Sequence, residues 1–131
     1  DWPAMAAAGV PVSVASDVGG GTSLNLPRTL ADGYKVQALG GHNLTAWCAL
    51  HAATRGAARA LHLDHEIGSL EPGRLADFCI WDWATGTVDG QRQQLARDLH
   101  ERVFAWLLMA DERHLVQTWV AGQARHTRTD R

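Results

Sequence analysis

An aspartate followed by a glycine run is the strongest candidate for chemistry in this sequence. Asp17 comes directly after a run of apolar and small residues at 10–16 and just before Gly19, Gly20 and Gly21. β-Branched residues that stop at glycines are typical of a buried parallel strand, which we expect at 10–16. In parallel barrels the carboxyl ends of the strands face the active site, and a carboxylate there can bind a divalent metal and take a proton from water. The pattern makes Asp17 a candidate metal ligand and catalytic residue.

Two alternative roles for these residues stay open. Aspartate also caps turns with its side chain, which is the structural alternative for Asp17. Glycine-rich loops also hold phosphates, but residues 19–23 (GGGTS) lack the lysine of a P-loop and the spacing of a dinucleotide fingerprint. We favour glycines that let the chain turn sharply beside a pocket, where a side chain would obstruct a ligand or a metal.

The seven histidines do not form a metal-binding motif. No His-x-His, His-Glu-x-x-His or cysteine-rich spacing occurs, so the chain by itself cannot build a catalytic metal site of three or four ligands. His62 and His65 are three apart, but we expect them at a solvated helix end. We predict that His51 is a hydrogen-bonded core residue. The other histidines occur singly and are assigned to the surface: His42, His100, His114 and His126.

Helices are predicted on both sides of Asp17. Residues before Gly9 form the tail of one helix, which the glycine closes. A second helix covers 25–40, with Pro27 in the first turn, where a missing N–H costs nothing. Another helix begins after Thr45, a common N-cap type, and carries apolar or small residues at steps of three and four. An apolar stripe predicts a last helix at 94–109.

Strands are predicted only in the second half of the chain, apart from residues 10–16. Alternating apolar residues indicate strands at 77–83 and 115–120. Gly122 turns the chain into a short last strand at 123–127, and the polar residues 84–93 are predicted to be a loop. Hydrophobic residues make up 46% of the sequence and charged residues 20%, which is ordinary for a folded domain.

Charge and cysteine usage exclude some partners. The formal net charge is −2, from 12 basic and 14 acidic residues that are mixed along the chain, which argues against nucleic acid as a partner. No apolar run approaches the roughly 20 residues that span a bilayer, which argues against a membrane. Cys48 and Cys79 do not make a disulfide framework, which favours a reducing, cytoplasmic setting.

Several segments resemble the amidohydrolase superfamily. Residues 67–78 (IGSLEPGRLADF) resemble the superfamily signature at which the chain leaves the barrel for a small β domain. Residues 16–23 (SDVGGGTS) resemble the end of the eighth barrel strand in the guanine deaminases of this superfamily. The resemblance runs in order along nearly the whole chain and includes four further segments: 28–36, 53–61, 109–113 and 119–122.

This resemblance implies an α/β fold: the C-terminal piece of a metal-dependent (β/α)8 barrel, joined to part of the small amidohydrolase β-sandwich domain. Residues 1–64 would be the last βα unit of the barrel, with its final strand and the helices after it. Residues 65–131 would be the C-terminal contribution to the small β domain, with one long helix. The rest of the barrel, an N-terminal segment, is then a partner that this chain requires.

The resemblance also implies an activity, the zinc-dependent hydrolysis of guanine to xanthine and ammonia by a homodimer. Asp17 matches the family's aspartate that binds zinc and helps to move the proton of the attacking water. The family's other ligands and most purine contacts lie upstream of the matching segment, so we expect the chain alone to be inactive. Two alternatives remain: an amidohydrolase acting on another heterocycle, such as cytosine or a pterin, and a stand-alone, non-catalytic α/β binding module.

Overall fold

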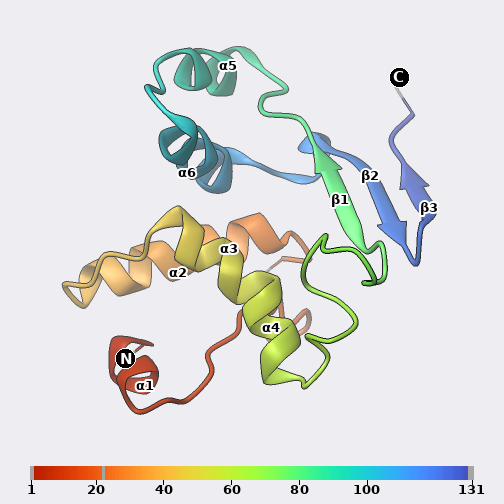
Figure 1. Ribbon diagram of the computed structural model, residues 1–131. Coiled ribbons are helices and arrows are strands. Elements are labelled where there is room, and N and C mark those ends of the chain that lie inside the picture. The colour runs from red at the N-terminus through yellow and green to blue at the C-terminus, as the bar shows by residue number, and fades with distance from the viewer. Residues whose placement is uncertain (1, 22, 130–131) are drawn as a thin grey trace.

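The computed structural model describes residues 2–21 and 23–129 and combines packed helices with one small sheet (Figure 1). The helices and strands alternate only in the second half of the chain. In chain order the elements are α1 (Trp2–Ala7), α2 (Leu26–Leu39), α3 (Ala46–Ala53), α4 (Arg55–Ala60), β1 (Phe78–Trp81), α5 (Thr87–Gln94), α6 (Leu99–Met109), the 3-10 helix η1 (Glu112–His114), β2 (Leu115–Val120) and β3 (Gln123–Thr127).

The strand predicted at 10–16 is absent, and this expectation was wrong. Residues 10–17 carry no regular structure and lie away from the sheet (Figure 1). Their one described backbone contact with a later helix is the N–H of Val14, which donates to the carbonyl of Ala52 at 3.2 Å. A parallel strand needs neighbouring strands for its backbone hydrogen bonds, and the strands of this chain pair with one another elsewhere. The helix tail before Gly9 is confirmed: α1 ends at Ala7, and Gly9 has a φ of +72°.

The helices after the glycine run begin where local capping places them. Asn25 caps α2 by accepting the N–H of Arg28 at 3.4 Å, and Thr45 caps α3 by accepting the N–H of Cys48 at 3.2 Å. The helix predicted after Thr45 is confirmed but divides into α3 and α4 at Thr54, whose φ is −126°. The hydroxyl of Thr54 donates to the carbonyl of Leu50 at 2.7 Å, a local bond that competes with continuation of the helix.

His51 is exposed, so its assignment to the core was wrong. The buried face of α3 consists of Ala46, Ala49 and Ala52, which are three residues apart. His51 lies in the last turn of α3, outside the line of buried alanines. Small alanine side chains on this face let α3 approach its neighbours closely.

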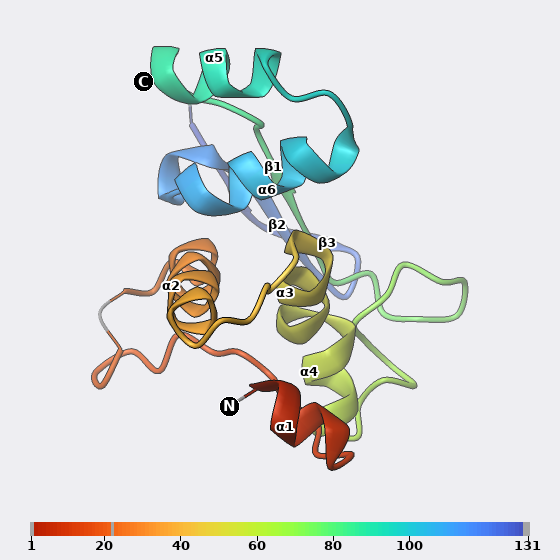
Figure 2. The same ribbon diagram turned by 90° about the vertical axis from the view of Figure 1, so that its left-hand side faces the viewer.

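The apolar core joins helices from both halves of the sequence. Figure 2 shows α5 and α6 stacked over α2 and α3. The rings of Tyr34 on α2 and Phe104 on α6 pack edge to face, with centroids 5.0 Å apart. Residues of α2, of α3 and of the segment between them therefore share one core with residues of the late helix α6: Leu30, Ala31, Leu44, Ala46, Ala49, Val103 and Leu107.

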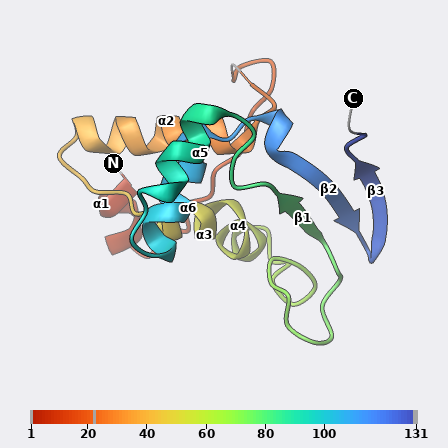
Figure 3. The same cartoon turned by 90° about the horizontal axis from the view of Figure 1, so that it is seen from above.

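The sheet is antiparallel in the order β1-β2-β3 and lies beside the helices (Figure 3). Phe78 pairs with Trp119 across β1 and β2, and the two rings stack at 5.5 Å. Ala121 and Gly122, with φ of +50° and +73°, form the two-residue turn between β2 and β3. The strands predicted at 115–120 and 123–127 are confirmed at their full length, and β1 lies inside the strand predicted at 77–83.

The loop predicted at 84–93 was wrong, because these residues contain most of α5. None of the residues of α5 is buried, so the helix carries no apolar stripe that periodicity could detect. Its first turn is held instead by Asp89, whose carboxylate accepts the N–H groups of Thr85 at 2.7 Å and Gly86 at 2.9 Å. The next helix, predicted from residue 94, begins only at Leu99, where Asp98 is the N-cap.

Cys48 and Cys79 are both free thiols on the surface. No helix in the described ranges, 2–21 and 23–129, is long and apolar enough to cross a membrane.

Candidate active-site turn

Asp17 is exposed and opens a tight turn that runs to Gly21. Its φ is +45°, in the left-handed region that residues other than glycine rarely adopt. The main-chain carbonyl of Asp17 accepts the N–H of Gly20 at 3.0 Å and also the N–H of Gly21. The turn is therefore closed by the backbone of Asp17. Among the residues that the structure describes, none donates a hydrogen bond to the Asp17 carboxylate.

This geometry argues against phosphate binding by the glycine run. The N–H groups of Gly20 and Gly21 are already used inside the turn, so they do not form a free cradle for a phosphate. A side chain at Gly21 is impossible, because its Cβ would lie 1.9 Å from the carbonyl oxygen of Ser16. The glycines thus allow the sharp turn that we expected beside Asp17.

The residues present fit one ligand of a metal site and not a complete set. No group of three His, Cys, Asp or Glu side chains in the described part of the chain could hold a metal ion. A catalytic zinc takes three protein ligands and a water, so Asp17 can supply only part of such a site. The exposed carboxylate of Asp17 is suitable as one such ligand.

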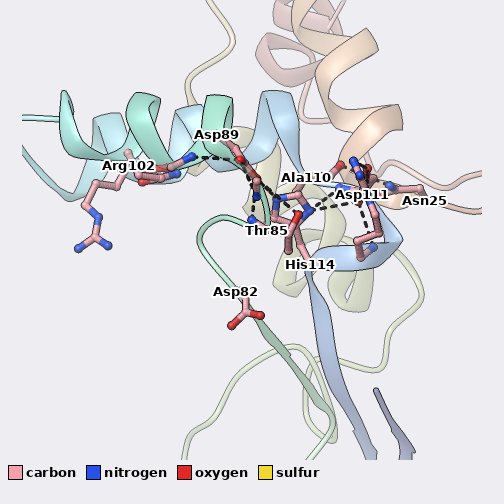
Figure 4. A network of polar contacts seen from close by, with 12 residues as sticks. Asn25, Asp82, Thr85, Asp89, Arg102, Ala110, Asp111 and His114 are labelled. Carbon is pink, nitrogen blue, oxygen red and sulfur yellow. Dashed lines mark hydrogen bonds and ion pairs between the residues drawn. The ribbon is translucent and has the colours of Figure 1, made fainter. Parts of the chain in front are cut away.

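His114 is buried at 1% exposure, so its assignment to the surface was wrong. Its Nε2 lies 3.0 Å from Oδ2 of Asp89, and its Nδ1 lies 3.2 Å from Oδ1 of Asp111 (Figure 4). The backbone N–H of Asp111 also donates to Nδ1 at 3.1 Å. A lone histidine in the sequence does not reveal such partners, because Asp89 lies 25 residues away.

The two carboxylates around His114 are strongly held in their ionised form. Hydrogen bonds from the backbone N–H of Thr85, and then from those of Gly90 and Gly86, lower the pKa of Asp89 to about 2, with His114 adding to the effect. The guanidinium of Arg113 is the largest cause that lowers the pKa of Asp111 to about 2. The ring is buried, and both of its nitrogens have hydrogen-bond partners within the protein. We therefore assign a structural role to this cluster.

Asn25 connects the segment after the Asp17 turn to this polar cluster. Its side-chain Nδ2 donates to the carbonyl of Ala110 at 3.3 Å, directly before Asp111 (Figure 4). Its backbone N–H donates to the hydroxyl of Ser23 at 3.0 Å. The beginning of α2 is thereby tied to the end of α6.

The signature at 67–78 has a structural role in this molecule. Glu71 accepts hydrogen bonds from Arg55 at 3.0 Å and from Arg74 at 3.2 Å, and the pKa of Glu71 is lowered, chiefly by Arg55. Asp77 accepts the N–H of Ala121 at 2.7 Å and so holds the turn between β2 and β3. These contacts fix the path of the chain from α4 into the sheet.

A separate apolar groove of about 840 Å³ lies between the helices and the sheet. Aliphatic and aromatic side chains line its walls, and Asp17 is not one of the residues that line it. The groove is therefore distinct from the Asp17 turn. Its aromatic lining consists of Phe78, Trp81, Trp83, Trp106 and Trp119.

Comparison with known proteins places both the turn and the signature in one family. The model of the amidohydrolase family matches residues 2–125. The chain is 34% identical to guanine deaminase of Escherichia coli over 119 residues, which are 91% of this chain and 27% of that protein. It is also 44% identical to imidazolonepropionase of Rhizorhabdus wittichii over 86 residues, which are 60% of this chain and 19% of that enzyme.

Solved structures agree with this assignment. The E. coli guanine deaminase structure matches 98% of this chain and 30% of its own, with a TM-score of 0.95 at 31% identity. The Bradyrhizobium japonicum guanine deaminase matches 92% of this chain and 32% of its own, with a TM-score of 0.85 at 26% identity. An adenosine deaminase from Xanthomonas campestris with bound zinc matches 77% of this chain and 21% of its own, at 30% identity and a TM-score of 0.56.

The chain spans 27% of the length of the E. coli guanine deaminase that it resembles. Its mixed fold of helices and strands matches a piece of the guanine deaminase structures, which confirms the fold class expected from the sequence. The resemblance on which that expectation rested is confirmed as well, and the chain belongs to the amidohydrolase family.

Proposed function

We propose that the chain is the C-terminal part of a zinc-dependent guanine deaminase, which converts guanine and water to xanthine and ammonia. In this reaction a carbon–oxygen bond to water forms, and the carbon–nitrogen bond to the amino group breaks. The observation that carries the proposal is the match to E. coli guanine deaminase over 98% of the chain, at a TM-score of 0.95, together with Asp17 at the start of its glycine turn.

Asp17 is the residue to which we assign the chemistry. A divalent metal, when bound, lowers the pKa of water and so makes a nucleophile available near neutral pH. Asp17 would offer one carboxylate oxygen to the metal and would hold the proton that the attacking water gives up. The exposure of Asp17 and the glycines around it support this role. The remaining ligands and the contacts to the purine would come from the N-terminal barrel segment.

We further propose that residues 1–64 are the last βα unit of the barrel and that residues 65–131 contribute to the small β domain. The position of the antiparallel sheet entirely within the second region supports this division. The free thiols of Cys48 and Cys79 support a reducing, cytoplasmic setting. A homodimer is proposed from the family resemblance.

An amidohydrolase that acts on another heterocycle is the second candidate. Its support is the 44% identity to imidazolonepropionase over 86 residues, which is higher than the identity to guanine deaminase but covers 60% of the chain instead of 91%. Barrel residues outside this chain would determine which of these substrates the enzyme binds.

The deciding experiment uses the complete polypeptide that contains this chain, purified with its metal. Zinc content is measured by mass spectrometry. Ammonia release is measured with guanine, cytosine and a pterin, and the hydrolytic ring opening of an imidazolone is followed in parallel by its loss of ultraviolet absorbance. We expect turnover of guanine, and we expect Asp17→Asn to lower kcat by about 100-fold or more, as loss of a general base does. Asp32→Asn is the control, because Asp32 is an exposed residue whose carboxylate is paired with Lys35 on the same helix.

Each component of the proposal fails on a different result. Turnover of another heterocycle, with guanine untouched, would remove guanine as the substrate. Wild-type zinc content and kcat in Asp17→Asn would remove Asp17 from the site. A complete polypeptide that neither holds zinc nor hydrolyses any of the four substrates would favour the non-catalytic binding module.

A further inference from the structure

A side chain would be unfavourable at each of the three glycines after Asp17, for a different reason at each position. Gly19 has a φ of +112°, a backbone conformation that disfavours any side chain, although a Cβ would meet nothing within 4 Å. At Gly21 a Cβ would collide with backbone, 1.9 Å from the carbonyl oxygen of Ser16. At Gly20 neither reason applies. Its φ lies outside the left-handed region, and its nearest obstacle is the side chain of Asp17.

The obstacle at Gly20 is specifically the carboxylate. A Cβ on Gly20 would lie 2.8 Å from Oδ2 of Asp17 and 3.5 Å from its Cγ, whereas the Asp17 carbonyl oxygen would be at an ordinary 3.8 Å. Real Cβ atoms do not approach other heavy atoms to 2.8 Å, so the carboxylate would have to rotate away. Rotation of an exposed side chain is inexpensive, so the backbone of the turn can remain as it is.

We propose that Gly20 is a positioning residue for Asp17: the missing Cβ at position 20 keeps free the space that the Asp17 carboxylate occupies. The inference rests on the proposed function, in which that carboxylate binds the metal and holds a proton. The backbone of the turn fixes where the Asp17 side chain begins, since Gly20 donates its N–H to the Asp17 carbonyl at 3.0 Å. The missing Cβ at Gly20 then permits the orientation that the carboxylate takes here.

The test is Gly20→Ala in the complete, zinc-loaded polypeptide. We expect zinc affinity, measured by competition with a chelator, to fall about tenfold or more, because residues that orient a ligand have effects of about 10- to 100-fold. The visible spectrum of the Co²⁺-substituted protein should change, since it reports ligand geometry. The melting temperature should stay close to that of the wild type, because the substitution displaces only an exposed carboxylate.

Gly90→Ala is the matched control for replacing a glycine by alanine. Gly90 lies within α5, has no positive φ, and a Cβ there would meet nothing within 4 Å. Zinc affinity, the Co²⁺ spectrum and kcat should all be those of the wild type in this variant. A Gly20→Ala protein that also matches the wild type in these three measurements would overturn the proposal.

A second background separates positioning from damage to the fold. Asp17→Gly removes the carboxylate and is relaxed at a φ of +45°, so Gly20→Ala has no side chain to displace in that background. The double variant should then match Asp17→Gly in zinc affinity and melting temperature. A further, additive loss would show that Gly20→Ala acts through the backbone and would overturn the proposal. If Asp17→Gly alone keeps wild-type zinc affinity and turnover, it is the proposed function that fails.

Discussion

His114 of η1 and Asp89 of α5 meet where these two helices pack together, with Nε2 of the ring 3.0 Å from Oδ2 of the carboxylate. On the other side of the ring, the backbone N–H of Asp111 donates to Nδ1 at 3.1 Å. The main-chain carbonyl of His114 also accepts the N–H of Asp82 at 2.8 Å, just past β1. One buried residue thus joins α5, η1 and the end of β1.

Replacement of His114 by leucine should destabilise the protein by about 1–3 kcal/mol, because Asp89 and the Asp111 N–H lose a buried partner. The measurement is the urea midpoint of unfolding, followed by tryptophan fluorescence. His126→Leu is the control, since His126 is an exposed residue of β3. Equal midpoints for the two variants would show that the cluster around His114 does not stabilise the fold.

The Asp89 carboxylate should make the protein sensitive to acid. Its pKa is lowered from 3.8 to about 2 in the folded protein, so the folded state binds the proton less readily than the unfolded chain. The stabilisation is therefore fully present above a pH of about 4 and is lost as the pH falls toward about 2. Asp89→Asn should be less stable at neutral pH and should depend less on pH between 2 and 4. Parallel pH profiles for the two proteins would contradict this assignment.

Gly68 should tolerate a side chain less well than Gly73, although both have nearly the same backbone conformation, with φ of +88° and +89°. A Cβ on Gly68 would lie 2.8 Å from Cβ of Ala58 and 3.0 Å from Cα of Arg55, whereas a Cβ on Gly73 would meet nothing within 4 Å. Gly73→Ala should cost about 1–2 kcal/mol of backbone strain. Gly68→Ala adds a steric cost of about 1–3 kcal/mol. Thermal unfolding compares the two variants, and equal losses would refute the close packing of the signature against α4.

The chain of 131 residues, produced alone, should bind zinc weakly and should not deaminate guanine. Asp17 supplies one ligand, and a catalytic zinc needs three from the protein. Equilibrium dialysis against zinc and an ammonia assay test this, with the complete polypeptide as the positive control. Tight stoichiometric zinc together with guanine turnover, in a sample free of other chains, would show that the active site is complete within this chain.

Local signals carried much of the fold prediction. Pro27, the Thr45 cap and the turn at Gly122 were all assigned correctly from the sequence. Each depends on residues that are only a few positions apart, so the sequence holds both partners of the interaction. The resemblance to the amidohydrolase family was carried by longer segments. The assignment of Asp17 to a metal site stays a prediction.

Tertiary structure decided the remaining features, because their partners are distant in the sequence. Residues 10–16 have the composition of a strand but no strand beside them to pair with. His114 is buried because Asp89, 25 residues earlier, is brought to its ring. By itself the sequence therefore determined the helix caps, the turns and the strands with alternating side chains. These features depend on local hydrogen bonds and on the periodicity of the side chains. The packing of the whole chain decides which histidine is buried. It also decides which extended segment pairs with another strand.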